Sequence, residues 1–310
     1  MDKWKLFVKL FVVAVLLFVF CFYGVMPQYT ENYQASLIDK VKRINEIEGP
    51  KIVLVGNSNL VFGIQSEILE EKLGMPVVNM GLHGGVGNCF NEQAAKLNVN
   101  KGDIYIICHS NYSDDDKIKN PELAWVTIEN HKELYSYIRK KDMWNMAKAY
   151  PSYLRKCIDQ WAFSTGNLEN EDPAYRRSSF NEYGDNISYR DKTVDGTDFS
   201  VVEVPEISDI TVERINKLNA EIIEKQATLL IAAYPIAYAN DAPGKEEYQV
   251  FTKILSDKMD CPVISEFSDY CLDPSYFFNT YLHLTNEGAK VRTELLAADI
   301  QRYLNNKEAY

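Results

Sequence analysis

Short apolar segments alternate with helical segments along most of this 310-residue chain, and this alternation restricts the possible folds more than any other feature. Segments with the composition of buried strands occur at 51–55 (KIVLV), 75–79 (MPVVN), 103–108 (DIYIIC), 228–233 (TLLIAA) and, shorter, at 262–264. Helical patterns occur at 66–73, 88–97, 212–226, 246–259 and 286–304. Strands that are apolar throughout and separated by helices indicate a parallel sheet with both faces covered. We therefore predict a doubly wound α/β fold.

The turns that follow the strands carry most of the candidate functional residues. Ligands of doubly wound folds bind beyond the carboxyl ends of the strands, where these turns lie together. The first turn contains Ser58 in GNSN, and the second contains Gly84 in NMGLHGGVG. The third turn contains Asn111 in HSNYS, and the loop before the last helical segment contains His283 in FFNTYLHLTNEGA. We expect these four residues to converge on one site.

This set of groups has what acyl transfer requires. A serine hydroxyl is a weak nucleophile and needs a base within hydrogen-bond reach, which His283 would supply for Ser58. The tetrahedral intermediate needs donors aimed at its oxyanion, and the backbone N–H of Gly84 and the amide of Asn111 are suitable. Each residue also has a simpler structural explanation: Ser58 as a helix N-cap, Asn111 as an Asx-turn residue, and His283 as a hydrogen-bonded histidine near a helix start.

In order, the four motifs resemble the blocks of the SGNH (GDSL-like) hydrolase superfamily. GNSN resembles the first block, usually GDS, with Asn57 in the place of the aspartate. VVNMGLHGG resembles the second block, in which Gly84 would donate its N–H. HSNY keeps Asn111 of the third block without its flanking glycine and aspartate, and HLTNEGA matches the last block at His283. The resemblance covers about 51–111 and 211–304, and it implies a flavodoxin-like SGNH fold that acts on esters.

The phrase FFNTYLHLTNEG is also similar to the ending of membrane-anchored SGNH proteins of the DltD-like and alginate-acetylation-like branch. That resemblance implies an extracytoplasmic serine esterase or O-acyltransferase. Its substrate would be acyl groups, by resemblance acetyl, on a cell-surface polysaccharide or other envelope polymer. The same resemblance implies a multispanning membrane acyltransferase as a possible partner.

The carboxylate that orients the histidine in this family is missing from the expected positions, which are Asn279 and Thr280. This acid normally fixes the tautomer and stabilises the imidazolium. Three explanations are open. Asn279 or a backbone carbonyl orients His283 in a slow dyad, or Asp273 or Asp269 replaces the acid. Alternatively the domain no longer catalyses, and acts as an accessory protein that binds a glycan or an acyltransferase.

The N-terminus has the composition of a membrane anchor. Residues 10–26 carry no charge, and Lys3, Lys5 and Lys9 form a basic flank before and within the apolar segment. That length spans a bilayer, and the basic flank places the N-terminal end in the cytoplasm. We therefore expect a single-pass anchor at 1–27, with the remaining chain extracytoplasmic in the cell membrane. A cleaved signal peptide is the alternative.

The rest of the chain divides into a stalk at 28–50 and an SGNH-like domain at 51–310. The segment of about 113–205 interrupts the strand–helix alternation after the third strand. We interpret it as a mostly helical insertion that overhangs the site.

Composition and motif spacing limit the possible ligands. The net charge of −11 and the isoelectric point near 5.0 argue against binding to duplex nucleic acid, which requires a basic surface. Neither H-x-H nor H-x-x-x-H occurs, so we expect no metal, and we expect no cofactor. His109 occupies the position that the family usually gives to glycine, where it would contact substrate.

Overall fold

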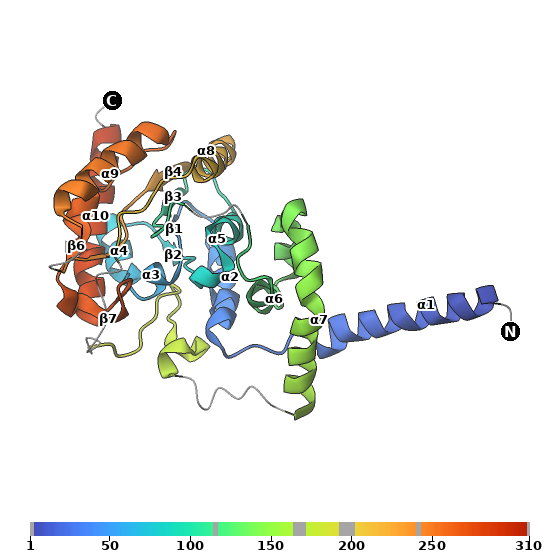
Figure 1. Cartoon of the computed structure of the whole chain (residues 1–310). Helices are drawn as coiled ribbons and strands as arrows, with labels where there is room; N and C mark the ends of the chain where they lie inside the picture. The colour runs from blue at the N-terminus through green and yellow to red at the C-terminus, as the bar shows by residue number, and fades with distance from the viewer. Residues whose placement is uncertain (1–2, 114–116, 164–171, 192–201, 240–242, 309–310) are drawn as a thin grey trace.

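The structure is a computed structural model that describes residues 3–113, 117–163, 172–191, 202–239 and 243–308. Its centre is a four-stranded sheet in the order β2-β1-β3-β4 (Figure 1). The strands are β1 (Ile52–Val55), β2 (Val77–Asn79), β3 (Ile104–Ile107) and β4 (Thr228–Ile231). All neighbouring pairs are parallel. The predicted α/β class with a parallel sheet is confirmed, while the fifth predicted strand is reduced to one bridge between Val263 and Ile231.

Helices cover both faces of this sheet. On one face, Leu54 and Ile106 pack with α4 (Ser66–Leu73) and α10 (Asn286–Glu308). On the other face, Val53 and Tyr105 pack with the remaining covering helices, which are α2 (Ser36–Glu46), α5 (Asn88–Ala95), α8 (Asp209–Glu224) and α9 (Lys245–Lys258). Burial on both sides explains why these strands are apolar throughout rather than alternating.

The segment expected as a stalk contributes to this packing. Within 28–50, α2 places Leu37, Val41 and Ile44 in the main core. Lys40 of the same helix is fully buried, and its ammonium donates to the carbonyl oxygens of Asn79 and Gly184 at 2.7 Å each. Helix α2 is therefore a layer of the α/β domain and not a free spacer.

The N-terminal helix α1 (Lys3–Phe20) projects away from the domain (Figure 1) and continues into a π-helical turn at Cys21–Val25. The span Lys3–Val25 is long and apolar enough to cross a membrane, and its side chains are mostly exposed. An exposed apolar helix of this length favours the expected single-pass anchor.

The insertion after β3 begins with two packed helices, α6 (Pro121–Ile128) and α7 (Lys140–Phe163). Asn120 caps α6 by accepting from the N–H of Leu123, and Pro121 stands at the first helical position, where it loses no hydrogen bond. The described part at 172–191 then runs along β2, where the N–H of Asn79 donates to the carbonyl of Tyr183 at 2.8 Å. It protects an otherwise open sheet edge.

Small elements beyond the carboxyl ends of the strands complete the fold. One is the four-residue helix α3 (Ser58–Val61), directly after β1. A parallel pair joins β5 (Ile236–Ala237) to β6 (Cys271–Leu272). An antiparallel hairpin joins β7 (Phe277–Thr280) to β8 (His283–Leu284) immediately before α10. The hairpin and α3 lie in contact, which brings the two ends of the domain together.

Candidate active site

The turn after β1 presents Ser58 at the carboxyl edge of the sheet. Asn57 caps α3 by accepting from the N–H of Asn59 at 3.1 Å, so the chain turns sharply and leaves Ser58 half-buried. Gly56 is needed for this turn, because a Cβ there would lie 2.8 Å from Leu60 Cδ1 and 3.1 Å from the Cys108 carbonyl oxygen. The sequence GNSN is therefore locally suited to hold one hydroxyl in a fixed place.

Helix α10 holds this turn in place through hydrogen bonds from one arginine. Arg292 of α10 is fully buried, and its guanidinium donates to the carbonyl oxygen of Asn59 at 2.6 Å and to Asn59 Oδ1 at 2.9 Å. Asn59 also donates through Nδ2 to the Cys108 carbonyl at 3.0 Å. Charge-assisted bonds to a buried turn restrict its motion, so the position of Ser58 is tied to α10 and β3.

The β7–β8 hairpin brings His283 to Ser58. Its Nε2 lies 2.9 Å from Ser58 Oγ, and its Nδ1 lies 2.7 Å from Asn279 Oδ1. Thr280 closes the hairpin by accepting from the N–H of His283 at 3.1 Å. Three of the expected site residues therefore form a continuous hydrogen-bonded row, Ser58–His283–Asn279.

A tyrosine from the insertion sets the orientation of the Asn279 amide. Asn279 Nδ2 donates to the hydroxyl oxygen of Tyr175 at 2.9 Å, which turns Oδ1 toward the imidazole. An oxygen at that position accepts from Nδ1–H, so the lone pair of Nε2 faces the Ser58 hydroxyl. Within the described residues no carboxylate contacts His283, and the Asp273 carboxylate instead accepts from the N–H of Ser275. The replacement acid expected at Asp273 or Asp269 is not found there.

The imidazole is held in an apolar and positively charged setting. His283 is 8% exposed, and the ring of Phe62 stacks on it with centroids 4.4 Å apart. The buried guanidinium of Arg190 lies 5.3 Å from the Phe62 ring centroid. Burial, and then the charge of Arg190 and the nearby His83, lower the pKa of His283 to about 3. The ring is therefore neutral at pH 7 and can accept a proton, but it is a weak base.

The second expected donor, Gly84, lies next to the nucleophile turn. A Cβ at Gly84 would be 3.7 Å from Asn57 Cβ, so its backbone faces the residue before Ser58. Within the described residues, the backbone N–H groups of Ser58 and Gly84 have no protein acceptor. Two free N–H groups beside a serine hydroxyl are suited to an oxyanion.

Asn111 is beside the site but forms no hydrogen bond with Ser58 or His283. Its Oδ1 accepts from the N–H and the hydroxyl of Ser113 at 2.7 and 3.0 Å, which is the Asx-turn arrangement. The preceding Ser110 accepts from Asn57 Nδ2 at 3.0 Å, so this loop borders the nucleophile turn. The Asx turn uses only the oxygen of the carboxamide, and within the described residues Asn111 Nδ2 has no acceptor, so its expected role as an oxyanion donor stays a prediction.

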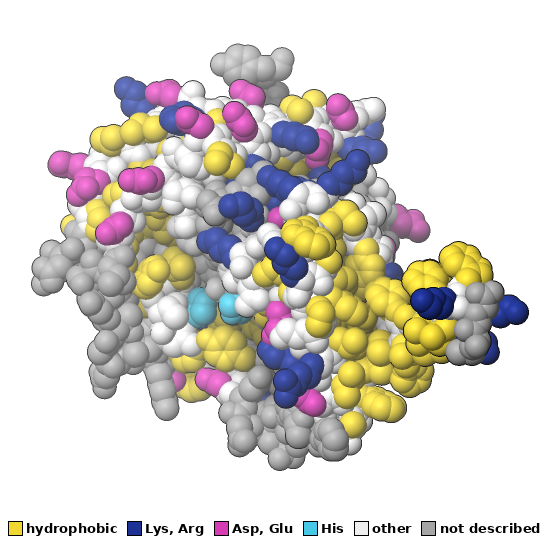
Figure 2. Space-filling view, turned by 45° about the vertical axis from the view of Figure 1, so that its right-hand side comes forward, with side chains coloured by type: hydrophobic (Ala, Val, Ile, Leu, Met, Phe, Trp, Pro, Cys, Tyr) yellow, Lys and Arg dark blue, Asp and Glu magenta, His cyan; other side chains and the backbone are white. Residues whose placement is uncertain are grey.

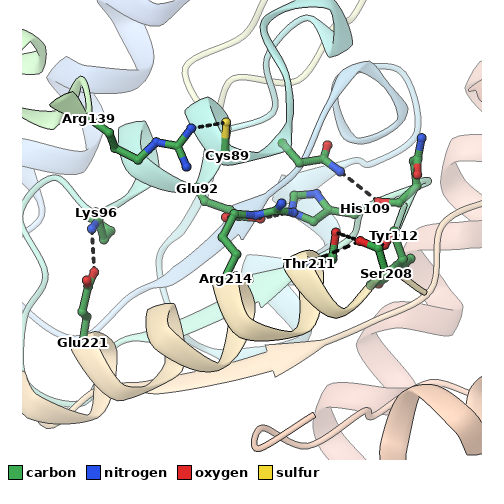
Figure 3. A network of polar contacts seen from close by, with 12 residues as sticks. Cys89, Glu92, Lys96, His109, Tyr112, Arg139, Ser208, Thr211, Arg214 and Glu221 are labelled. Carbon is green, nitrogen blue, oxygen red and sulfur yellow. Dashed lines mark hydrogen bonds and ion pairs between the residues drawn. The ribbon is translucent and has the colours of Figure 1, made fainter. Parts of the chain in front are cut away.

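His109 points away from the site, contrary to expectation. It is fully buried, and its Nε2 lies 2.8 Å from Glu92 Oε1. Figure 3 shows His109 beside Glu92 of α5 and Arg214 of α8, whose Nε donates to Glu92 at 2.9 Å. This charged cluster braces two helices against β3, and it does not face substrate.

A pocket of about 370 Å³ is lined by the loop after β3 and by Tyr281 and Leu282 of the β7–β8 hairpin, and Ser58, His283 and Asn279 are not part of its wall. Hydroxyl, amide and carboxyl groups line much of it, among them Ser110, Asn111, Glu203, Glu206 and Tyr281. Leu282, next to His283 in sequence, is also part of the wall. The polar lining suits a hydroxyl-rich ligand better than an apolar one.

Three residues of the site were not expected from sequence. Tyr175, Arg190 and Phe62 act on Asn279 and His283 through tertiary contacts, and no local motif marks them. The nearest signal is the aromatic and basic composition of 175–190. Comparison of the chain with protein-family models, with curated proteins and with solved structures finds no match.

Proposed function

We propose that this chain is a serine-dependent acyl-transfer enzyme of the SGNH type. One observation carries the proposal: Ser58 Oγ lies 2.9 Å from His283 Nε2, while Asn279 Oδ1 lies 2.7 Å from Nδ1 of the same ring. A base must reach the proton it removes within hydrogen-bond distance, and this row meets that condition. Ser58 is half-buried and not sealed in the core.

The chemistry follows from these positions. His283 Nε2 takes the proton of Ser58 as Oγ bonds to the acyl carbonyl carbon, and the carbonyl oxygen becomes the oxyanion. The N–H groups of Ser58 and Gly84 stabilise that charge, at about 3 kcal/mol for each donor. The C–O bond to the leaving alcohol then breaks, and the proton on His283 passes to the alcohol oxygen. A water or a second hydroxyl, deprotonated by His283, releases the acyl group in the reverse sequence.

Asn279 takes the position of the third group. Its carbonyl oxygen fixes the tautomer with hydrogen on Nδ1 but carries no full charge to stabilise the imidazolium. Because burial and Arg190 also lower the pKa of His283, the base is weak and the reaction slow.

More specifically, we propose a membrane-anchored extracytoplasmic esterase or O-acyltransferase that acts on acetyl groups of a cell-surface polysaccharide or envelope polymer. The apolar α1 supports the anchor, and the polar pocket at Ser110, Asn111 and Tyr281 supports a sugar as acyl acceptor or donor. A multispanning membrane acyltransferase is the proposed partner, because an anchored domain that transfers acyl groups outside the cell needs a supply of them.

A catalytically inactive accessory protein is the second candidate. The absence of a carboxylate at His283, within the described residues, and the low pKa of the imidazole favour it. Such a protein would use the pocket at Ser110 and Tyr281 to bind a glycan without reacting with it.

The experiment that separates the two is reaction of the full-length protein in detergent with a fluorophosphonate probe and with p-nitrophenyl acetate. We expect covalent labelling and slow turnover in the wild type and neither in Ser58→Ala. Ser275→Ala, at an exposed serine for which the structure shows no contact with Ser58, His283 or Asn279, should behave as the wild type. Equal labelling and turnover of wild type and Ser58→Ala would reject catalysis at Ser58 and leave the accessory role.

A further inference from the structure

Helix α7 exposes large apolar side chains that a soluble surface does not need. The exposed fractions are 58% for Met143, 67% for Trp144, 39% for Ile158 and 55% for Trp161. Two exposed tryptophans on one helix are unusual, because tryptophan buries the most apolar area of any residue. This side of α7 needs a covering partner.

The other residues of α7 divide the helix into further faces. Successive residues of an α-helix are about 100° apart, so the four exposed apolar residues fall in one sector about 100° wide. Met146, Tyr153 and Cys157 point to the domain and are buried. The remaining sector is exposed and mainly basic, with Lys141, Lys148, Arg155 and Lys156. Arg155 lies 4.0 Å from Asp159 in the same sector and Lys156 pairs with Glu122, so part of this positive charge is already balanced at the surface. An apolar face with tryptophan beside a basic face is the pattern of a helix that lies in a membrane interface.

The position of α7 relative to the anchor points to the same partner. Phe20, the last residue of α1, meets the Trp161 ring edge-on with centroids 6.4 Å apart, and Phe18 lies 5.9 Å from Tyr150. Figure 1 shows α7 running across the end of α1 rather than alongside it. A helix placed across the end of a membrane-spanning helix lies at the level of the bilayer surface and not within the hydrocarbon core. Figure 2 shows apolar side chains gathered around the root of α1 on this side.

The residues that connect α1 to the domain contact the insertion at several points. Glu129, which follows α6, accepts from the N–H of Tyr29 at 2.5 Å. Lys132 Nζ lies 3.9 Å from the Tyr23 ring centroid and 5.5 Å from that of Phe22. These contacts fix the direction of α1 relative to the insertion. The bilayer that surrounds α1 would therefore meet α7 at a defined place.

We propose that α7 is an interfacial helix that lies on the lipid surface where α1 enters the membrane. The inference rests on the proposed membrane anchoring but not on the proposed catalysis. Trp144, Ile158 and Trp161 insert at the boundary between headgroups and acyl chains, and the basic sector pairs with anionic headgroups. Helices α1 and α7 then both attach the domain to the membrane, and this double attachment orients the site relative to the bilayer.

The test uses the full-length protein in phosphatidylcholine vesicles that contain brominated lipid, which quenches tryptophan on contact. All variants carry Trp4→Phe, because Trp4 belongs to α1, and the variant that also carries Trp144→Phe and Trp161→Phe gives the emission of the remaining Trp125, which is subtracted throughout. With Trp144 and Trp161 present, we expect emission to fall about twofold with bromine at acyl carbons 6 and 7, and less with deeper bromine, because interfacial helices insert only ~5–10 Å. Adding phosphatidylglycerol should increase the quenching, and salt should reverse that increase.

The matched control moves the reporter to another exposed apolar position. In the protein with Trp144→Phe and Trp161→Phe, Val250→Trp places tryptophan on α9, where Val250 is 58% exposed. Figure 1 shows α9 on the opposite side of the domain from α1, so this reporter should remain unquenched. Absence of quenching at Trp144 and Trp161 would overturn the proposal and leave a protein as the occupant of this face. Equal quenching at Val250→Trp would also overturn it, because contact with lipid would then be nonspecific.

Discussion

Replacing Asn279 by aspartate should activate the site if Ser58 and His283 form a catalytic pair. The substitution preserves size and places a carboxylate oxygen where Asn279 Oδ1 now lies, 2.7 Å from His283 Nδ1. Tyr175 accommodates the change, because its hydroxyl now accepts from Nδ2 and can donate to a carboxylate instead. Asn279 is half-buried, so a carboxylate there remains hydrated enough to stay ionised at pH 7.

The size of the effect follows from the charge pair. Two unit charges about 4 Å apart in a protein attract by ~4 kcal/mol, which is about three pKa units. The pKa of His283, now lowered to about 3 mainly by burial, should therefore rise to near 6. A stronger base accelerates proton transfer, but the rate rises by less than the full factor of about 1000 that three pKa units represent. For comparison, replacing the acid by asparagine in serine proteases slows turnover ~10⁴-fold. We expect kcat for p-nitrophenyl acetate to increase by between about 30-fold and 1000-fold.

The assay is turnover at pH 7 together with the NMR titration of the His283 ring. Ser58→Ala in the Asn279→Asp background should remove the gain, and Ser275→Asp, a charge at an exposed position before β7, should give none. A raised pKa of His283 with no gain in turnover would refute the argument, because the base would then not limit the reaction. A gain that survives Ser58→Ala would refute it as well.

Three further outcomes are expected. The acid limb of the wild-type kcat/KM profile should lie far below pH 6.5, because His283 keeps its neutral form until the pH approaches its lowered pKa of about 3; in Asn279→Asp it should move up toward pH 6. Tyr175→Phe should lower kcat about tenfold with KM unchanged, since the amide of Asn279 loses the acceptor that orients it. The melting temperature of this variant should equal that of the wild type. Asp185→Ala should lower the free energy of unfolding in urea by about 3 kcal/mol, because Ser66 and Asn79 lose their buried acceptor, whereas Asp191→Ala at an exposed site should change it by less than ~0.5 kcal/mol.

The pH also acts on stability through His283. The unfolded imidazole takes up a proton as the pH falls through about 6.5, but the folded one does so only near its lowered pKa of about 3. Between these values the unfolded state binds more protons, so stability should fall as the pH decreases through this window. The urea midpoint measured from pH 7 to pH 4 tests this dependence, and it should be weaker in Asn279→Asp.

The central fold was predictable because its signals are local. Each sheet strand is a short apolar run, and the helix at 66–73 ends where expected at Gly74, which takes the left-handed conformation with φ of 64°. The proximity of Ser58 and His283 was predictable for a different reason, since ligands of doubly wound folds bind beyond the carboxyl ends of the strands, where the turn after β1 and the loop before α10 were both expected. Neither inference required knowledge of side-chain packing.

The features that were missed depend on distant or competing partners. The Asx turn of Asn111 with Ser113 was weighed from sequence as its simpler explanation and is present, while the role of the Asn111 amide nitrogen as an oxyanion donor stays a prediction. His109 was expected at the site, but Glu92 and Arg214, far away in sequence, hold it in the interior. The orientation of Asn279 depends on Tyr175, 104 residues earlier, which no spacing rule connects to it.

Residues 172–191, the second described part of the insertion, contact the site on more than one side. Tyr175 orients Asn279, and the backbone of Arg190 exchanges hydrogen bonds with Asn286 at 2.7 and 3.0 Å, directly after the His283 hairpin. Asp185 of the same segment accepts from Asn79 Nδ2, at the start of the Gly84 loop. The insertion therefore holds both the His283 hairpin and the loop of Gly84, while its α7 lies against α1. If α7 rests on the membrane, one continuous part of the chain sets both the orientation of the domain and the geometry of its candidate site.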